Sequence, residues 1–257
     1  MRSLPHILIV LFLLTIISCN SSDETSIIED QVLELDDFDY FEDDIPYQAT
    51  RYQINPNHDK IAALGRILFY DPSLSLNNSI SCSSCHQQQS AFSDNKVFSP
   101  GIRGFETTRN SMALANNAYQ ISHFWEGGVG VIEDFVLNPV SNHIEMGMRS
   151  IDDLVAKLSE NKEYNKLFNE VHNAPISEEL IAISISTFVA SIISHNSKFD
   201  KGQDLNFANF SAGELAGKDL FFGKAKCGNC HKGYHFTATW RRYANIGLDM
   251  NLSLIHI

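Results

Sequence analysis

The sequence predicts an all-α fold in two domains, because its apolar residues recur at helical spacing and one five-residue motif occurs twice. Several segments show the helical period, and no segment pairs two alternating strands around a tight turn. The motif Cys-x-x-Cys-His occupies residues 82–86 and again 227–231. We therefore place an N-terminal domain at 51–198 and a C-terminal domain at 199–257, with the segment FDKGQD as the link between them.

The first 18 residues predict a targeting signal rather than part of either domain. Arg2 is followed by an apolar run of 11 residues at 7–17, which is too short to span a bilayer as a helix. The run ends in Ile-Ile-Ser before Cys19, which resembles a bacterial lipobox. We expect a lipoprotein signal peptide over 1–18 and lipidation of Cys19, in the periplasm or at the outer membrane. The alternative is an ordinary secretory signal with a chance cysteine.

Residues 19–50 are expected to form an acidic, disordered tether. Eleven of the 31 acidic residues lie between Asp23 and Asp44, and no Lys or Arg lies between Arg2 and Arg51. From Arg51 onward, the chain contains 20 acidic and 18 basic residues. No basic stripe is visible, so the sequence gives no reason to expect a nucleic-acid partner.

Helices are predicted in order along both domains. In the first predicted helix, Ile61, Leu64 and Leu68 share one face. Ser150 precedes the second as its N-cap, and a capping box of Ser211 and Glu214 opens the last. The predicted ranges are 58–71, 151–158, 162–171, 176–196 and 211–222.

The five cysteines divide into Cys19 and two Cys-x-x-Cys-His units. Two disulfides are one alternative in an exported chain, and a Cys₄ zinc site is another. Zinc-site cysteine pairs are usually about 15–20 residues apart, whereas Cys85 and Cys227 are far apart in the sequence. Neither alternative explains the histidine after each second cysteine. Covalent c-type haem explains it, because two thioether bonds hold the porphyrin and the histidine binds its iron.

We therefore expect two c-type haems, one in each domain, so that both domains are cytochrome c-like. One is bound covalently by Cys82 and Cys85, with His86 as its proximal iron ligand. The other is bound by Cys227 and Cys230, with His231 as its proximal ligand. Each haem would add apolar surface to a segment that is poor in apolar residues.

The chain resembles the bacterial di-haem cytochrome c peroxidase family and its relatives that oxidise partner proteins. The resemblance rests on four segments, LGRILFYDPSLSLNNSISCSSCH (64–86), TRNSMALANNAY (108–119), HFWEGGVGVIEDFVLNPVSNHIEMG (123–147) and GKDLFFGKAKCGNCHKG (217–233). It implies a peroxidatic haem in the N-terminal domain and an electron-accepting haem in the C-terminal domain.

The resemblance also implies roles for individual residues. Glu145 matches the catalytic acid of the family, which moves a proton between the two peroxide oxygens. Phe124 would line the pocket, and Trp125 would lie between the haems as an electron route. Asn110 matches an amide that binds the calcium ion between the haems. An ordinary core tryptophan is the alternative for Trp125.

Departures from the family pattern modify these expectations. Glu126, Gly127 and Gly128 replace a common Asp-Gly-Arg, and Phe135 replaces a common glutamine. We read residues 87–122 as offering no histidine or methionine that could cap the iron, so we expect an iron site that is open in the oxidised state. We expect His123 and His143 to be pocket-wall or surface residues.

The C-terminal domain is expected to be incomplete in this chain. Met250 lies too close to the second motif to match the axial methionine of the family, and residues 252–257 resemble adapter-derived sequence.

The implied activity is reduction of hydrogen peroxide to water with electrons from a small cytochrome c or cupredoxin, and a homodimer is left open. The first alternative is an oxidase of the same fold that acts on a partner protein. The second is a di-haem electron carrier without catalysis, although a carrier does not need the acid at Glu145.

Overall fold

The structure is a computed structural model that describes residues 33–41, 52–120, 122–125, 130–233 and 235–236. Four sequence predictions concern residues outside this part: the signal peptide with Cys19, the Glu126–Gly128 substitution, Met250 and residues 252–257. Within the described ranges there is no strand, only two isolated bridges, Gln87 with Ser93 and Pro100 with Glu106. No helix in this part is long and apolar enough to cross a membrane.

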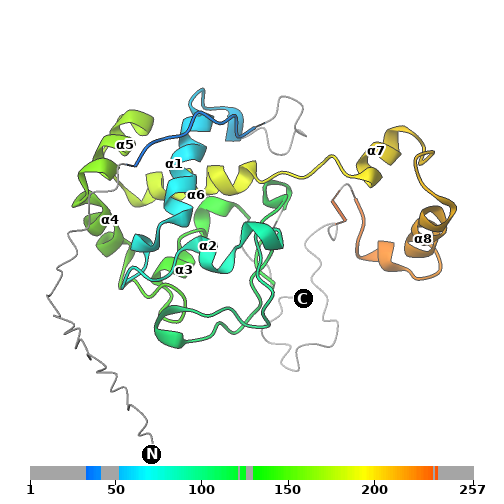
Figure 1. The fold of residues 1–257 in the computed structure, drawn as a ribbon, viewed down its shortest axis with the longest axis horizontal. Coiled ribbons are helices and arrows are strands. Elements are labelled where there is room, and N and C mark those ends of the chain that lie inside the picture. Colours follow the sequence, from blue (N-terminus) through cyan, green and yellow to red (C-terminus); the bar gives the residue numbers. More distant parts are fainter. Residues whose placement is uncertain (1–32, 42–51, 121, 126–129, 234, 237–257) are drawn as a thin grey trace, which may run out of the picture. The chain divides into compact units, whose positions relative to one another are not determined.

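The all-α prediction is confirmed (Figure 1). The α-helices are α1 (His58–Tyr70), α2 (Cys82–Cys85), α3 (Asn138–Ser141), α4 (Ile151–Ser159), α5 (Lys162–His172), α6 (Glu178–Ser191), α7 (Lys198–Asp204) and α8 (Ala212–Phe222). The short 3₁₀ helices are η2 (Pro72–Leu74), η3 (Gln88–Ser90), η4 (Ile102–Gly104), η5 (Asn117–Tyr119), η6 (Ile132–Asp134) and η7 (Cys227–Asn229).

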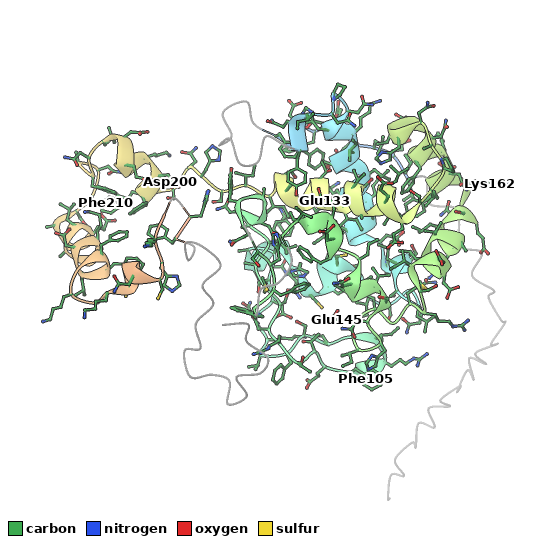
Figure 2. All side chains as sticks on the ribbon, turned by 180° about the vertical axis from the view of Figure 1, so that it is seen from behind. Phe105, Glu133, Glu145, Lys162, Asp200 and Phe210 are labelled. Carbon is green, nitrogen blue, oxygen red and sulfur yellow. The ribbon has the colours of Figure 1, made fainter. Side chains whose placement is uncertain are left out.

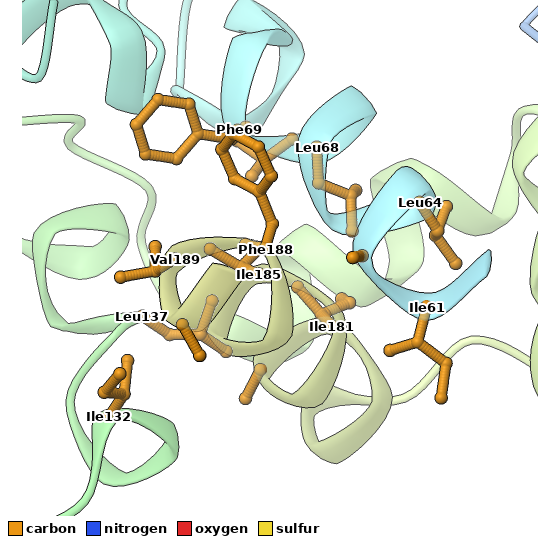
Figure 3. Packing of buried hydrophobic residues seen from close by; sticks show 14 of the residues in the cluster. Ile61, Leu64, Leu68, Phe69, Ile132, Leu137, Ile181, Ile185, Phe188 and Val189 are labelled. Atoms are coloured by element: carbon orange, nitrogen blue, oxygen red, sulfur yellow. The ribbon is translucent and has the colours of Figure 1, made fainter. Parts of the chain in front are cut away.

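The core is centred on the contact between α1 and α6. Figure 3 shows apolar side chains of α1 facing those of α6, and the buried members include Ile61, Leu64, Leu68, Ile181 and Ile185. Gly65 makes the contact close, because a Cβ at this position would lie only 1.9 Å from the backbone oxygen of Ser184. The face predicted for the first helix is therefore the buried face.

The predicted helix starts are also found. Ser150 accepts a hydrogen bond from the backbone N–H of Asp153 at the start of α4. Ser211 and Glu214 form the predicted capping box of α8, with Glu214 accepting from the Ser211 backbone N–H at 2.6 Å. In α5 the predicted apolar residues are buried, namely Tyr164, Leu167, Phe168 and Val171.

The predicted extent of one helix is wrong. The helix predicted over 176–196 ends at Ser191, because Ile192 leaves the helical conformation and the chain turns to Asn116. The Asn116 backbone N–H donates to Ile192 O, and its side chain forms two hydrogen bonds with the backbone of Ser194. The segment FDKGQD, which we expect to link the two domains, lies within α7, and this helix begins with a capping box of Ser197 and Asp200.

Residues 33–41, here called the N-terminal strap, are packed rather than disordered. Phe41 is buried, and Leu33, Leu35 and Tyr40 lie against the core. The Tyr40 backbone N–H donates to Asp59, and Asp36 forms an ion pair with Arg66 in α1 at 2.9 Å. The expectation of a disordered tether is therefore wrong for this stretch, because alternating apolar residues among the acids bury their side chains.

Candidate functional site

Serine side chains hold the first Cys-x-x-Cys-His motif in place. The buried hydroxyl of Ser75 donates to Pro72 O and accepts from the backbone N–H groups of Ser79 and Ile80. Ser81 then caps α2 through a capping box with Ser84. The segment is thus fixed by hydrogen bonds to its own backbone rather than by apolar burial.

The hydrogen bonds of His86 decide which of its ring nitrogens is free. Its Nδ1 lies 2.9 Å from Phe92 O and 3.0 Å from Met112 O, with the Ser111 hydroxyl at 3.2 Å. Carbonyl oxygens can only accept, so Nδ1 carries the hydrogen. Burial lowers the pKa of His86, which favours the neutral ring. Nε2 is therefore unprotonated, as an iron ligand requires.

Burial disfavours the reactive thiolate form of the two cysteines before His86. Burial raises the pKa of Cys82 to about 12, and burial also raises that of Cys85. Redox-active Cys-x-x-Cys pairs need a lowered thiol pKa. The four cysteines of the two motifs are free of disulfides. Neither observation favours a disulfide exchange site at this motif.

A cavity of about 290 Å³ brings most of the predicted site residues together. Its wall is mainly apolar, with Phe69, Ile132, Ile185 and Val189 among the lining side chains. The predicted residues on this wall are Cys82, Cys85, His86, Asn110, His123, Phe124, Trp125, Phe135 and Glu145. They come from segments up to about 60 residues apart in the chain, so only the fold gathers them.

The loop after α3 fixes the position of Glu145 (Figure 2). Its backbone N–H donates to Asn142 O at 3.1 Å, and its carbonyl accepts from the Ile102 N–H at 2.8 Å. Gly101 permits this contact, because a Cβ there would lie 1.9 Å from Ile144 O. Burial raises the pKa of Glu145, opposed by a hydrogen bond from the Asn142 side chain. The backbone contacts therefore fix the carboxyl at the cavity, and its burial favours the protonated form.

Phe124 and Trp125 line the mouth of the cavity and are partly exposed. Phe124 adopts a left-handed backbone conformation with φ of 66° and packs on Phe135. Trp125 is 55% exposed and donates from Nε1 to the backbone oxygen of Asn110 at 2.9 Å. The Asn110 side-chain N–H₂ donates to Lys96 O, which leaves its Oδ1 as the atom that could meet a cation.

The two histidines outside the motifs differ in position. His123 is buried in the wall and stacks near Phe135, with ring centroids 4.7 Å apart. His143 is exposed and is not among the residues that line the cavity. Both positions agree with the expectation of pocket-wall or surface residues.

The expectation of an open iron site rested on reading residues 87–122 as free of both histidine and methionine, and the methionine part is wrong because Met112 lies there. This methionine lies in the 87–122 stretch and lines the cavity, and a thioether can bind haem iron. Its backbone oxygen accepts from the proximal candidate His86, which places its backbone beside that ligand.

The second motif repeats the local geometry of the first. His231 Nδ1 lies 3.2 Å from Phe236 O, as His86 Nδ1 lies close to Phe92 O. Phe236 packs on Phe199 and Phe221. Helix α8 has no buried residue, and Leu220 and Phe222 are about half exposed. This uncovered apolar surface beside Cys227 and Cys230 is what a porphyrin would cover.

Both motifs therefore fit c-type haem. Each offers two cysteines, a histidine held through Nδ1 and a neighbouring apolar surface. Sequence reasoning missed the groups that orient His86, because two of them are backbone carbonyls. Ser111, which donates to Cys85 O at 2.7 Å, could have been noticed only as part of the quoted segment 108–119.

Comparison with known proteins settles the family. The family model described as di-haem cytochrome c peroxidase matches residues 59–205, which is more than half of the chain. The chain belongs to the di-haem cytochrome c peroxidase family. It is 32% identical over 188 residues to the cytochrome c peroxidase Ccp of Escherichia coli (strain K12), a match that covers 73% of this chain and 40% of that protein.

Other relatives are named MauG or MauG-like proteins. The methylamine utilization protein MauG of Methylorubrum extorquens is 29% identical over 194 residues, covering 75% of this chain and 55% of that protein. A crystal structure of a MauG-like protein associated with microbial copper homeostasis superposes with a TM-score of 0.63 and 33% identity, covering 71% of this chain and 56% of that one. The chain thus spans about half the length of the relatives it matches.

Proposed function

We propose that this chain is the peroxide-reducing part of a di-haem peroxidase. Hydrogen peroxide would be reduced to water at the cavity beside Cys82 and Cys85, and electrons would enter near Cys227 and Cys230. The observation that carries the proposal is that the unprotonated Nε2 side of His86 and the half-buried carboxyl of Glu145 line the same cavity. The family membership supports the same reaction.

A bound haem would supply the iron that binds peroxide and passes electrons to it. Cys82 and Cys85 would hold the group covalently, and His86 would bind through Nε2. Glu145 would take the proton of the inner peroxide oxygen on its carboxylate and return it to the outer oxygen. The outer oxygen then leaves as water rather than as hydroxide, which lowers the barrier.

The remaining site residues have supporting roles in this proposal. Phe124 lines the entrance and limits access of water, with Phe135 beside it. Trp125 offers an aromatic route for electrons between the two haem sites. Asn110 would bind calcium through Oδ1. Its backbone oxygen accepts a hydrogen bond from the Trp125 indole N–H, so the calcium site would lie next to this tryptophan.

The proposal extends to location and partners. We place the protein outside the cytoplasm, anchored through lipidated Cys19. The electron donor would be a small cytochrome c or a cupredoxin. A homodimer is compatible with this arrangement.

Oxidation of a partner protein is the second candidate function. Phe135 occupies the place of a common polar residue and makes the cavity wall more apolar, and Trp125 is 55% exposed at the mouth.

Steady-state consumption of peroxide by the haem-loaded protein, with a reduced small cytochrome c as donor, tests the proposal. We expect Glu145→Gln to lower the rate by about 10²-fold or more, because the amide cannot relay the proton. Glu106→Gln, an exposed carboxylate on the neighbouring loop, is the matched control and should keep the rate. Equal rates for both variants would exclude Glu145 from the reaction.

A further inference from the structure

A chain of aromatic rings runs from the candidate iron ligand to the N-terminal strap. His86 lies 6.5 Å from Phe69, measured between ring centroids, and Phe69 lies 5.1 Å from Phe188. Figure 3 shows these two phenylalanines facing each other between α1 and α6. Phe188 in turn contacts Tyr40 of the strap, edge to face at 6.2 Å. The family match begins at residue 59, so Tyr40 lies outside the matched part.

Tyr40 has a built-in proton acceptor. Its hydroxyl donates to both carboxylate oxygens of Asp36 at 2.9 Å, and Asp36 is held by Arg66 at 2.9 Å. Burial and the Asp36 carboxylate raise the pKa of Tyr40, so the phenol stays protonated at physiological pH. Loss of an electron makes a phenol strongly acidic, and the proton then passes along the existing hydrogen bond. This coupling makes tyrosine oxidation easier than electron loss alone.

We propose that Tyr40 is a redox-active tyrosine that donates single electrons to the first haem site through Phe188 and Phe69. The inference rests on the proposed function, because peroxide reduction at that site is the oxidant. Tyr40 loses one electron along the rings and its phenolic proton to Asp36, which leaves a neutral tyrosyl radical. Two such oxidations balance one hydrogen peroxide, which becomes two water molecules. A soluble one-electron reductant, such as a small phenol, would restore Tyr40.

Tyr70 is the natural comparison for Tyr40. It also contacts Phe188, at 6.4 Å, but the Arg66 guanidinium lies over its ring at 5.9 Å. A cation over the ring opposes removal of an electron from it. Phe69 and Phe188 have no hydroxyl proton to release, so they serve only as the path for the electron between Tyr40 and the first haem site. The Arg66 charge also acts on Tyr40, but the Tyr40 hydroxyl donates to the Asp36 carboxylate, so Tyr40 combines the contact with Phe188 and a ready proton acceptor.

Freeze-quench electron paramagnetic resonance of the haem-loaded protein tests this inference. Peroxide is added without an electron donor, using protein labelled with ring-deuterated tyrosine to identify a tyrosyl signal. We expect Tyr40→Phe to abolish the signal, because the ring stays packed while the hydroxyl is lost. Tyr70→Phe should retain it. Asp36→Asn should abolish it, while Arg66→Gln, which removes the ion pair and keeps the acceptor, should retain it.

A nitroso spin trap followed by peptide mass spectrometry gives an independent location. The adduct should map to Tyr40 by fragmentation of the peptide that ends at Arg51. A signal that survives Tyr40→Phe, or normal peroxide consumption without any tyrosyl radical, overturns this inference and leaves the proposed function standing. Failure of the protein to consume peroxide at all overturns both.

Discussion

Two backbone carbonyls determine the chemical state of His86. Phe92 O and Met112 O occupy the Nδ1 side, so the neutral ring presents Nε2 to the cavity. The sequence marked His86 through its motif, but neither carbonyl could be predicted, because one is 26 residues away and backbone groups leave no residue-type signal. The same limit explains why Ser111 was missed.

The half-buried carboxyl of Glu145 should make stability depend on pH. Burial raises its pKa in the folded state, whereas in the unfolded chain a glutamate titrates at about 4.3. The folded protein is therefore most stable with respect to this group below about pH 4.3, where Glu145 is protonated in both states. That contribution to the free energy of unfolding is lost as the pH rises through the pKa of Glu145 in the folded protein. We expect Glu145→Gln to raise the thermal midpoint at pH 8 and to change it little at pH 4.

Thermal unfolding of haem-loaded protein at both pH values measures this effect. Glu106→Gln again provides an exposed control that should show no comparable gain at pH 8. A larger gain for Glu145→Gln at pH 4 than at pH 8 would reverse the expected sign and contradict the burial argument.

At the scale of elements, features set by residues close in sequence were predicted well, and features set by distant residues were predicted poorly. The buried face of α1 and the Ser150 cap follow from residues close in sequence. The end of α6 is set by Asn116, which lies more than 70 residues earlier. No pattern within the helix sequence therefore predicts where α6 ends. Helix α7 contains Gly202 and charged residues, a composition that also suits a link.

The close contact of α1 and α6 predicts a sensitive glycine. Gly65→Ala should destabilise the protein by about 1–3 kcal/mol or more, because the added methyl collides with the Ser184 backbone oxygen, which has little freedom to move. Gly213→Ala in α8 is the matched control, since its Cβ would meet nothing within 4 Å and alanine favours a helix. Chemical denaturation measures both; equal stability of the two variants would refute the close contact.

Over the whole molecule, the two motif regions differ in how much core the polypeptide provides. Around the first motif, α1, α5 and α6 bury a continuous apolar cluster. Around the second, α8 has no buried residue and its apolar side chains are exposed. The sequence predicted both motifs equally, because the spacing of a motif does not report the packing around it.

This difference predicts unequal dependence on haem. Replacing both Cys227 and Cys230 by serine should make residues 198–236 sensitive to protease, while 58–191 stay protected by their own core. The corresponding Cys82 and Cys85 double variant should leave protection of α1 and α6 largely intact. Limited proteolysis with peptide mapping tests this, and equal protection of 198–236 with and without its cysteines would contradict it.

The mass of the intact protein, matured in a host that attaches c-type haem, tests the central claim most directly. Our account predicts a gain of two haem groups, one on the peptide with Cys82 and Cys85 and one on the peptide with Cys227 and Cys230. A protein that gains no haem mass, with these cysteines free or joined in disulfides, would contradict it.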